Sequence, residues 1–331
     1  MKVKVWLGVL VSLGLLVYLF SKIDLARLWS IIKTVDPYYL AAVAFLSVAF
    51  LWVRALRWRY IVYPVKKDVP VGRLFSATMI GFMANNVLPA RLGEFVRAYA
   101  LGRSEDVSKS AVFATIVVER LFDGMSVLLL LIYALAFLPP EVATGGVAAT
   151  IRTAGEISLV AYGAVITVLV YFLYRPDTLD RAVRAVIGPF SKGFAEKASV
   201  MAGSFITGLG VVKDKRLLSL ILFYSAVHWG LLWTPLYLLF KAFGLHYGVY
   251  ESVFMLVVMC FSVALPSTPG YVGTFHAAAT GGLMLLGMEA EPALGVAILA
   301  HAASYVPVTL LGFYYLYKAN MSLRGLKKAE A

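Results

Sequence analysis

The chain contains a series of apolar runs separated by short polar segments, and each run is close to the length that crosses a membrane as a helix. A spanning α-helix needs roughly 20 mostly apolar residues. Such runs occupy residues 5–20, 38–53, 110–138, 157–174, 217–240 and 292–317. Hydrophobic residues make up 61% of the 331 residues and charged residues only 15%, whereas soluble proteins average roughly 45–50% and 25%. This composition excludes a disordered chain, a soluble enzyme and a typical nucleic-acid-binding protein, and it predicts an all-α polytopic membrane protein.

The basic residues are distributed in a way that orients the chain in the membrane. The 30 Lys and Arg residues outnumber the 18 Asp and Glu residues, and cytoplasmic loops are the ones enriched in Lys and Arg. Basic residues concentrate in 54–73, in 175–216 and in the tail 318–331, whereas 139–156 contains one arginine. We therefore expect a multi-pass protein of the cell membrane with an external loop at 139–156 and both termini in the cytoplasm. The segment 175–216 predicts amphipathic helices that lie on the membrane surface.

Several arginines match the composition of a membrane–water interface. Arg54, Arg57 and Arg59 follow the apolar run 38–53 and stand among tryptophan and tyrosine residues. Aromatic and basic residues together are typical of the interface. We therefore place these three arginines at the cytoplasmic interface, and we expect Arg97 to face solvent or lipid headgroups.

Two segments are apolar but interrupted, at 74–102 and 251–287. The first is broken by the polar stretch 85–94, and the second by a Pro- and Gly-rich stretch at 266–273. Neither half of either segment contains the roughly 20 apolar residues that a spanning helix needs. We predict two re-entrant helical hairpins, the first entering from the cytoplasm with its tip near 85–89, and the second entering from outside.

The order of these elements predicts an inverted repeat. Each half, 1–138 and 157–317, contains two helices, a hairpin and a further helix, and loop charge gives the halves opposite orientations. The predicted fold is thus about six full transmembrane helices plus two hairpins. Paired interrupted segments in two inverted halves are the best sequence indicator of a transporter site. An irregular bundle with two proline-kinked helices is the alternative interpretation.

The two breaks are the predicted binding region, because irregular backbone at membrane depth is tolerated only inside protein or beside a water-filled cavity. Pro89 and Pro269 suit the first turn of a helix. Thr268 suits an N-cap, and Asn86 can serve near the first break. Each break then starts a half-helix whose N-terminus attracts anions such as phosphate.

Charged residues near the first break form the predicted cluster. Arg91 can bind a phosphate in bidentate fashion. Arg120 together with Glu94, Glu119 and Asp123 completes the cluster, since ionisable residues within a membrane usually pair and face a cavity. A purely structural role remains open both for a Glu94–Arg97 ion pair and for a buried Glu119–Arg120–Asp123 network.

The candidate site is a substrate-binding site without a predicted metal or cofactor. The lone Cys260 and four histidines without HExxH-like spacing indicate no metal site, and no GxxxxGK[ST] motif for ATP is found. The candidate substrate-binding residues are Asn85, Asn86, Pro89, Arg91, Glu94, Glu119, Arg120, Asp123, Ser267, Thr268, Gly270, Gly273 and His276.

Three motifs in order resemble a known family. They are Asn85-x-x-x-Pro89-x-Arg91-x-Gly93-Glu94, Glu119-Arg120-x-x-Asp123 and Pro266-x-x-Pro269-Gly270-x-x-Gly273. Together they resemble the lysylphosphatidylglycerol synthase transmembrane-region family of flippase-like membrane proteins, over roughly residues 5–317. The resemblance implies movement of a phospholipid headgroup, or of a related isoprenoid or glycolipid, between leaflets. Some members also carry a synthase or glycosyltransferase domain. Only a short charged tail follows residue 317, so we expect translocation alone. His276 stands where the family often has an acidic residue.

These observations favour a flippase- or scramblase-like transporter of a phosphate-containing lipid: a phospholipid, an aminoacyl-phospholipid or an isoprenoid-linked lipid. Movement of the lipid would be passive or ion-coupled. Secondary transport of a small soluble anion is the alternative, followed by a membrane-embedded transferase using His276 with Glu94 or Asp123. We expect a lipid and an anionic membrane surface as partners, no nucleic acid and no enzymatic activity, and the oligomeric state stays open.

Overall fold

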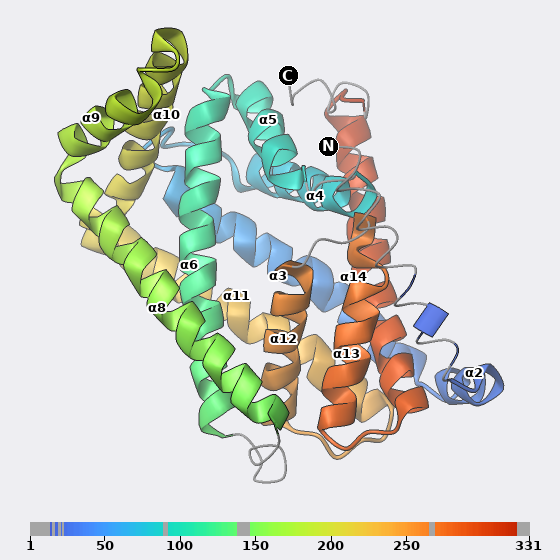
Figure 1. Ribbon diagram of the computed structural model, residues 1–331. Coiled ribbons are helices and arrows are strands. Elements are labelled where there is room, and N and C mark those ends of the chain that lie inside the picture. The colour runs from blue at the N-terminus through green and yellow to red at the C-terminus, as the bar shows by residue number, and fades with distance from the viewer. Residues whose placement is uncertain are drawn as a thin grey trace.

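The computed structural model describes residues 23–88, 92–137, 146–264 and 269–322, with isolated positions between 14 and 21, and the regular structure of these residues is helical (Figure 1). The α-helices are α2 (Leu25–Lys33), α3 (Pro37–Val62), α4 (Val71–Val87), α5 (Gly93–Glu105), α6 (Lys109–Ala136), α8 (Gly146–Tyr174), α9 (Pro176–Ile187), α10 (Lys192–Leu209), α11 (Lys215–Ala242), α12 (Val249–Ala264), α13 (Thr274–Leu285) and α14 (Ala290–Lys318). Short 3₁₀ turns are η2 (Gly210–Lys213) and η3 (Pro269–Tyr271).

The long helices confirm the all-α membrane architecture. In the described part of the chain, α3, α8, α11 and α14 are long and apolar enough to cross a membrane. Helix α6 has 28 residues, a comparable length, but it carries three charged side chains in its middle. The predicted first span at 5–20 lies outside the described residues except for isolated positions.

Polar side chains at the helix starts explain where the long helices begin. Asp36 accepts a hydrogen bond from the Tyr38 amide at the start of α3, and Pro37 occupies the first turn. Asp214 accepts from the first amides of α11 in the same way. Such caps satisfy amides that have no partner within the helix, and proline lacks the amide that would otherwise be unsatisfied there.

Helices α4 and α5 pack against each other and form the two arms predicted for the first interrupted segment. A side chain is excluded where they meet, since a Cβ atom on Gly81 would lie 2.8 Å from the Gly93 carbonyl oxygen. The Asn85 Oδ1 atom accepts from the Gly93 amide at 2.7 Å and so caps α5. For α5 the capping acceptor is therefore Asn85 and not Asn86, while Pro89 lies outside the described residues. Helix α5 begins at Gly93, the residue whose amide donates to Asn85.

Helices α12 and α13 form the corresponding pair in the second half. The break between them contains η3, and both Gly270 (φ 71°) and Gly273 (φ 96°) have left-handed backbone conformations that suit glycine. Pro269 begins η3 and not α13, which begins at Thr274. The half-helix therefore starts later in the chain than predicted from Pro269, because η3 and the turn at Gly273 precede it.

The two halves pack in matching ways. The central pair is α3 and α11, which lie against each other and are joined by a contact of 3.1 Å between His228 Nδ1 and the Phe50 carbonyl oxygen. In the first half α3 packs on α4 and α5 on α6, as α11 packs on α12 and α13 on α14 in the second. Between the halves, α4 contacts α14 and α12 contacts α6. This equivalence supports the repeat, while the orientation of the halves in the membrane stays a prediction.

Segments predicted to be cytoplasmic gather at one end of the molecule. Helices α5, α9 and α10 lie at the top of Figure 1 together with the C-terminal end of α14. The connection from α13 to α14 lies at the opposite end. The elements with basic flanks therefore share one end, as a membrane orientation requires.

The close approach of α4 and α5 predicts that Gly81→Ala destabilises the protein. Its Cβ would lie 2.9 Å from Arg97 Cβ as well as close to the Gly93 carbonyl, and such overpacking costs roughly 1–3 kcal/mol. The matched control is Gly72→Ala on the same helix, where a Cβ meets nothing within 4 Å. We expect a lower apparent Tm in detergent for Gly81→Ala only. Equal Tm values for the two variants would contradict this packing.

Candidate functional site

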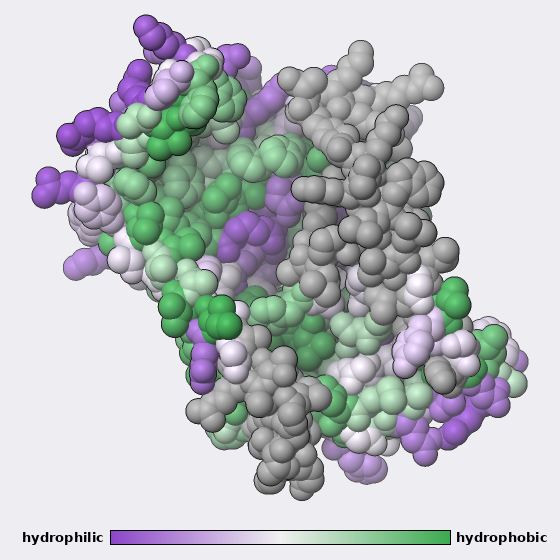
Figure 2. Space-filling view, viewed as in Figure 1, coloured by the Kyte–Doolittle hydropathy of each residue, from purple (hydrophilic) through white to green (hydrophobic). Residues whose placement is uncertain are grey.

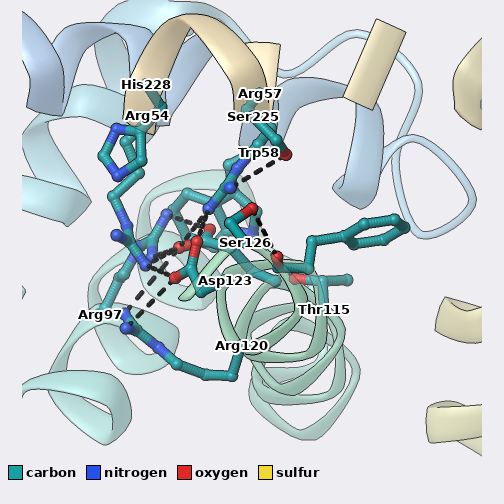
Figure 3. Close-up of polar contacts among 12 residues, drawn as sticks. Arg54, Arg57, Trp58, Arg97, Thr115, Arg120, Asp123, Ser126, Ser225 and His228 are labelled. Atoms are coloured by element: carbon teal, nitrogen blue, oxygen red, sulfur yellow. Dashed lines mark hydrogen bonds and ion pairs between the residues drawn. The ribbon is translucent and has the colours of Figure 1, made fainter. Parts of the chain in front are cut away.

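The interior of the bundle contains a cluster of buried charges contributed by three helices (Figure 3). We call it the arginine cluster, and its buried members are Arg54 and Arg57 on α3, Arg97 on α5, and Glu119 and Asp123 on α6. Glu119 and Asp123 are one helical turn apart, so both carboxylates point from α6 toward the same neighbours. The described side chains of this cluster are almost fully shielded from solvent.

Glu119 is held mainly by Arg97. The Arg97 Nη1 and Nη2 atoms donate to the two Glu119 carboxylate oxygens, both at 2.9 Å. The Arg97 guanidinium also lies 3.7 Å above the Trp58 ring, and the Trp58 indole donates to Thr115. Arg54 forms a further ion pair with Glu119. A bidentate pair stacked on an aromatic ring uses the guanidinium geometry that lysine lacks.

Asp123 joins the two arginines of α3. Arg54 Nη2 donates to Asp123 Oδ2 at 2.7 Å, and Arg57 Nη2 donates to Asp123 Oδ1 at 2.6 Å. The other Arg57 terminal nitrogen donates to Ser225 Oγ on α11 at 3.1 Å. The cluster therefore ties α3, α5, α6 and α11 together in the region where the two halves meet.

The buried part of the cluster has surplus positive charge. Its three arginines face two carboxylates. The Nε–H groups of Arg54, Arg57 and Arg97 are buried and make no hydrogen bond within the described part of the chain. Buried charges are stable only when they are paired and hydrogen-bonded. The arrangement therefore favours an additional anion nearby.

Arg120 and Glu94 connect the cluster to the accessible side. The Arg120 side chain is 42% exposed and lies 3.3 Å from Asp123 and 3.6 Å from Glu94. The Glu94 side chain is itself 30% exposed. Both distances exceed those of the hydrogen-bonded pairs Arg97–Glu119, Arg54–Asp123 and Arg57–Asp123. Because Arg120 and Glu94 are also partly exposed, their contact can open at lower cost than the buried pairs.

A second group of polar and aromatic side chains lies where the two hairpin breaks meet. The Tyr305 hydroxyl on α14 donates to the Asn86 carbonyl at 3.2 Å, and Asn86 Nδ2 donates to Thr309 at 2.8 Å. A Cβ atom on Gly270 would lie 2.6 Å from the Tyr305 ring, so only glycine fits there. His276 is buried, within the same region of the second hairpin.

The residues predicted from sequence fall into three groups. Glu94, Glu119, Arg120 and Asp123 come together in the arginine cluster. The residues at the breaks are Asn85 and Gly273, which shape turns, and Asn86, Gly270 and His276, which lie at or near the junction. Pro89, Arg91, Ser267 and Thr268 lie outside the residues whose side chains are described. A role of any of them in substrate binding stays a prediction.

The positions expected for three arginines are wrong. Arg54 and Arg57 are buried in the cluster and do not mark the interface, whereas Arg59 is exposed. Arg97 is 2% exposed and does not face solvent. The signal available in sequence was the pair Glu119 and Asp123, because two carboxylates inside an apolar helix need more cations than Arg120 alone. The spacing of Arg54 and Arg57 also puts them near one helix face.

Figure 2 shows a recess on the face that contains α6 and α8, with hydrophilic residues in its depth and hydrophobic residues beside it. Helix α8 has exposed apolar side chains along its length, including Ile157, Val160 and Tyr171. An apolar surface of this kind suits contact with lipid tails. The class of protein is thus a helical membrane protein with a buried arginine–carboxylate cluster beside an apolar exterior.

Comparison with known sequences gives the family. The chain matches the family described as the lysylphosphatidylglycerol synthase TM region over residues 5–312. It therefore belongs to this family, and the resemblance noted from its motifs is confirmed.

Three archaeal proteins are among the relatives. The glycosyltransferase AglD of Haloferax volcanii is 27% identical over 97% of this chain, which spans 55% of AglD. A UPF0104 membrane protein of Methanothermobacter thermautotrophicus is 24% identical, over 84% of this chain and 82% of that protein. The UPF0104 membrane protein PH1989 of Pyrococcus horikoshii is 24% identical, over 90% and 94%. No solved structure matches the chain.

The geometry of the cluster predicts unequal costs for two similar substitutions. Glu119→Gln removes the charge that pairs with Arg97 and Arg54 and leaves buried arginines uncompensated, which costs roughly 3–5 kcal/mol. Glu94→Gln breaks only a partly exposed pair and costs about 1 kcal/mol or less. Unfolding of the purified variants in detergent measures both. A Glu119→Gln protein as stable as Glu94→Gln would show that the buried pairs contribute little.

Proposed function

We propose that this protein moves a phosphate-containing lipid between membrane leaflets, with the arginine cluster as the headgroup site. The proposal rests on one observation: the buried part of the cluster has more arginines than carboxylates, and the partly exposed Arg120 lies beside it. A phosphate group would supply the missing negative charge and accept hydrogen bonds from a guanidinium.

Arg120 is the group that meets the headgroup first. Its contacts with Asp123 and Glu94 are 3.3 and 3.6 Å long, so an incoming phosphate can compete for the guanidinium. The buried arginines hold Asp123 in place, and their charge attracts the phosphate through the low-dielectric interior. Glu94, released from Arg120, can accept from a hydroxyl or amino group of the same headgroup.

A lipid is favoured over a soluble anion by the surroundings of the cluster. The recess in Figure 2 adjoins apolar surface, and α8 exposes large hydrophobic side chains. The acyl chains of a lipid can then remain in the bilayer while its headgroup enters. The family description refers to a lipid synthase, and one relative is a glycosyltransferase, which supports a lipid-related function without specifying translocation.

Movement between leaflets would use the paired hairpins. The breaks of the two hairpins meet at Gly270, Asn86 and Tyr305. Rocking of one half against the other around this junction is the alternating access that inverted repeats permit. The headgroup would pass from the arginine cluster on one side to the corresponding part of the second half.

The proposal predicts that Arg120→Gln slows lipid exchange. Protein in liposomes is assayed with headgroup-labelled phosphatidylglycerol and an external quencher, and we expect exchange at least roughly tenfold slower than wild type, because a charge-assisted hydrogen bond is lost. The matched control is Arg103→Gln on α5, which is exposed and should keep the wild-type rate.

Wild-type exchange no faster than that of empty liposomes would exclude the proposal. Uptake of a soluble phosphate ester by the same liposomes tests the alternative. A saturable uptake with no lipid exchange would identify the protein as a transporter of soluble anions.

A further inference from the structure

The repeat assigns to Arg120 a counterpart in the second half. Helices α13 and α14 both begin 181 residues after their counterparts, from Gly93 to Thr274 and from Lys109 to Ala290. With this common offset Arg120 corresponds to His301. Each residue lies on the helix that follows a hairpin, and each is the same number of residues from the first residue of that helix.

The equivalent interface in the second half contains imidazole and aromatic rings instead of ion pairs. The His276 and His301 rings contact each other edge to face, with centroids 4.9 Å apart. The Phe275 ring stacks on the His301 ring with centroids 4.9 Å apart, and the Tyr305 ring meets the His301 ring edge to face at 5.2 Å. The histidine pair is therefore positioned at the junction of the two hairpins.

One of these histidines has an unused polar atom. His276 is 8% exposed, and its Nδ1 atom is buried without a hydrogen-bond partner among the described residues. Leaving such an atom unpaired is costly, so it normally has a ligand, an ion or a water molecule as partner. An unprotonated imidazole nitrogen accepts a hydrogen bond from a ligand, and a protonated one donates a hydrogen bond to an anion.

The pair has no described counter-charge. Tyr305 is the titratable side chain that contacts His301, and no described carboxylate or basic residue forms an ion pair with either ring. On these two helices and the elements packed against them, other groups hold the charged side chains that form ion pairs or capping bonds: Arg27 with Glu289 and Glu291, Arg54 and Arg57 with Asp123, Arg73 with Glu105, and Glu251 with the Gly248 amide. Of the others, Lys33, Lys241 and Lys318 lie over aromatic rings of their own helices, and Arg59, Lys215 and Arg216 are exposed. Cys260 on α12 is a free thiol. Protonation of the pair therefore needs an anion that enters with the proton.

We propose that His276 and His301 form a second phosphate-binding site, which receives the lipid headgroup after it leaves Arg120 and holds it only when the imidazoles carry a proton. This inference rests on the proposed function and specifies the step of each half: Arg120 in the first half binds the headgroup first, and the histidine pair in the second half binds it next. The site takes a phosphate monoester or diester, because the unpaired Nδ1 atom and the protonated ring would donate to its oxygens.

The two sites then respond differently to pH. An arginine remains charged at all relevant pH values, whereas histidine changes its charge between about pH 5 and 8. Binding at Arg120 is thus constant over this range, and binding at the histidine pair strengthens as the pH falls. By linkage, phosphate bound at the second site promotes protonation by the same factor as the proton promotes phosphate binding.

The experiment isolates the second site with a ligand whose own charge is constant. Short-chain phosphatidylglycerol is titrated into the purified Arg120→Gln protein in detergent at pH 5.5 and pH 8, since its phosphodiester stays ionised throughout. We expect binding at pH 5.5 to be at least about tenfold tighter than at pH 8, as for a site that must first bind a proton. Adding His276→Gln or His301→Gln should abolish this difference. Adding His301→Arg should give binding that is tight at both pH values.

The matched control is His246→Gln, which removes an exposed histidine and should leave the pH response unchanged. The inference is wrong if the Arg120→Gln protein binds equally at both pH values, or if its pH response survives in the His276→Gln/His301→Gln background. Failure of the proposed function is separate, because it shows as absent lipid exchange in liposomes while this pH-dependent binding in detergent persists.

Discussion

The pairing of Glu119 and Asp123 with three buried arginines is the interaction on which the rest of the structure depends. Two carboxylates in the middle of a long apolar helix are not tolerated alone, and their partners come from α3 and α5. Those contacts fix the first hairpin against α6 and bring α3 to the centre of the molecule. Through Ser225 they extend to α11, the helix that corresponds to α3 in the second half. One set of charges therefore positions both the fold and the candidate site.

The same interface has different chemistry in the two halves. In the first, α5 and α6 meet through ion pairs, and in the second, α13 and α14 meet through His276, His301 and aromatic rings. Under the proposed function, the matching backbone packing would give a lipid headgroup comparable surroundings in each half, and the different side chains would make its affinity differ between the two halves. A ligand with equal affinity for two states does not shift the equilibrium between them, so such a difference would let headgroup binding favour one state.

Much of the candidate site could be predicted from the apolar pattern and its exceptions. Interrupted runs identified both hairpins, and charges within apolar runs identified Glu119, Arg120 and Asp123. Arg54 and Arg57 were misplaced because their neighbours are tryptophans and tyrosines, which occur both at interfaces and around buried guanidinium groups. The cap of α5 was assigned to Asn86 and not to Asn85, since the acceptor reaches an amide eight residues further along the chain only after the hairpin has folded.

The sequence by itself determined that this is a helical membrane protein, where its helices and breaks lie, and the family to which it belongs. These properties follow from hydropathy and local backbone preferences, which depend on neighbouring residues. Only the tertiary structure decided which charges neutralise one another, that Arg97 is buried on Trp58, and that His276 meets His301. Those pairings join residues that are distant in sequence, and their energies depend on burial and on distances of a few ångströms, which no local pattern specifies.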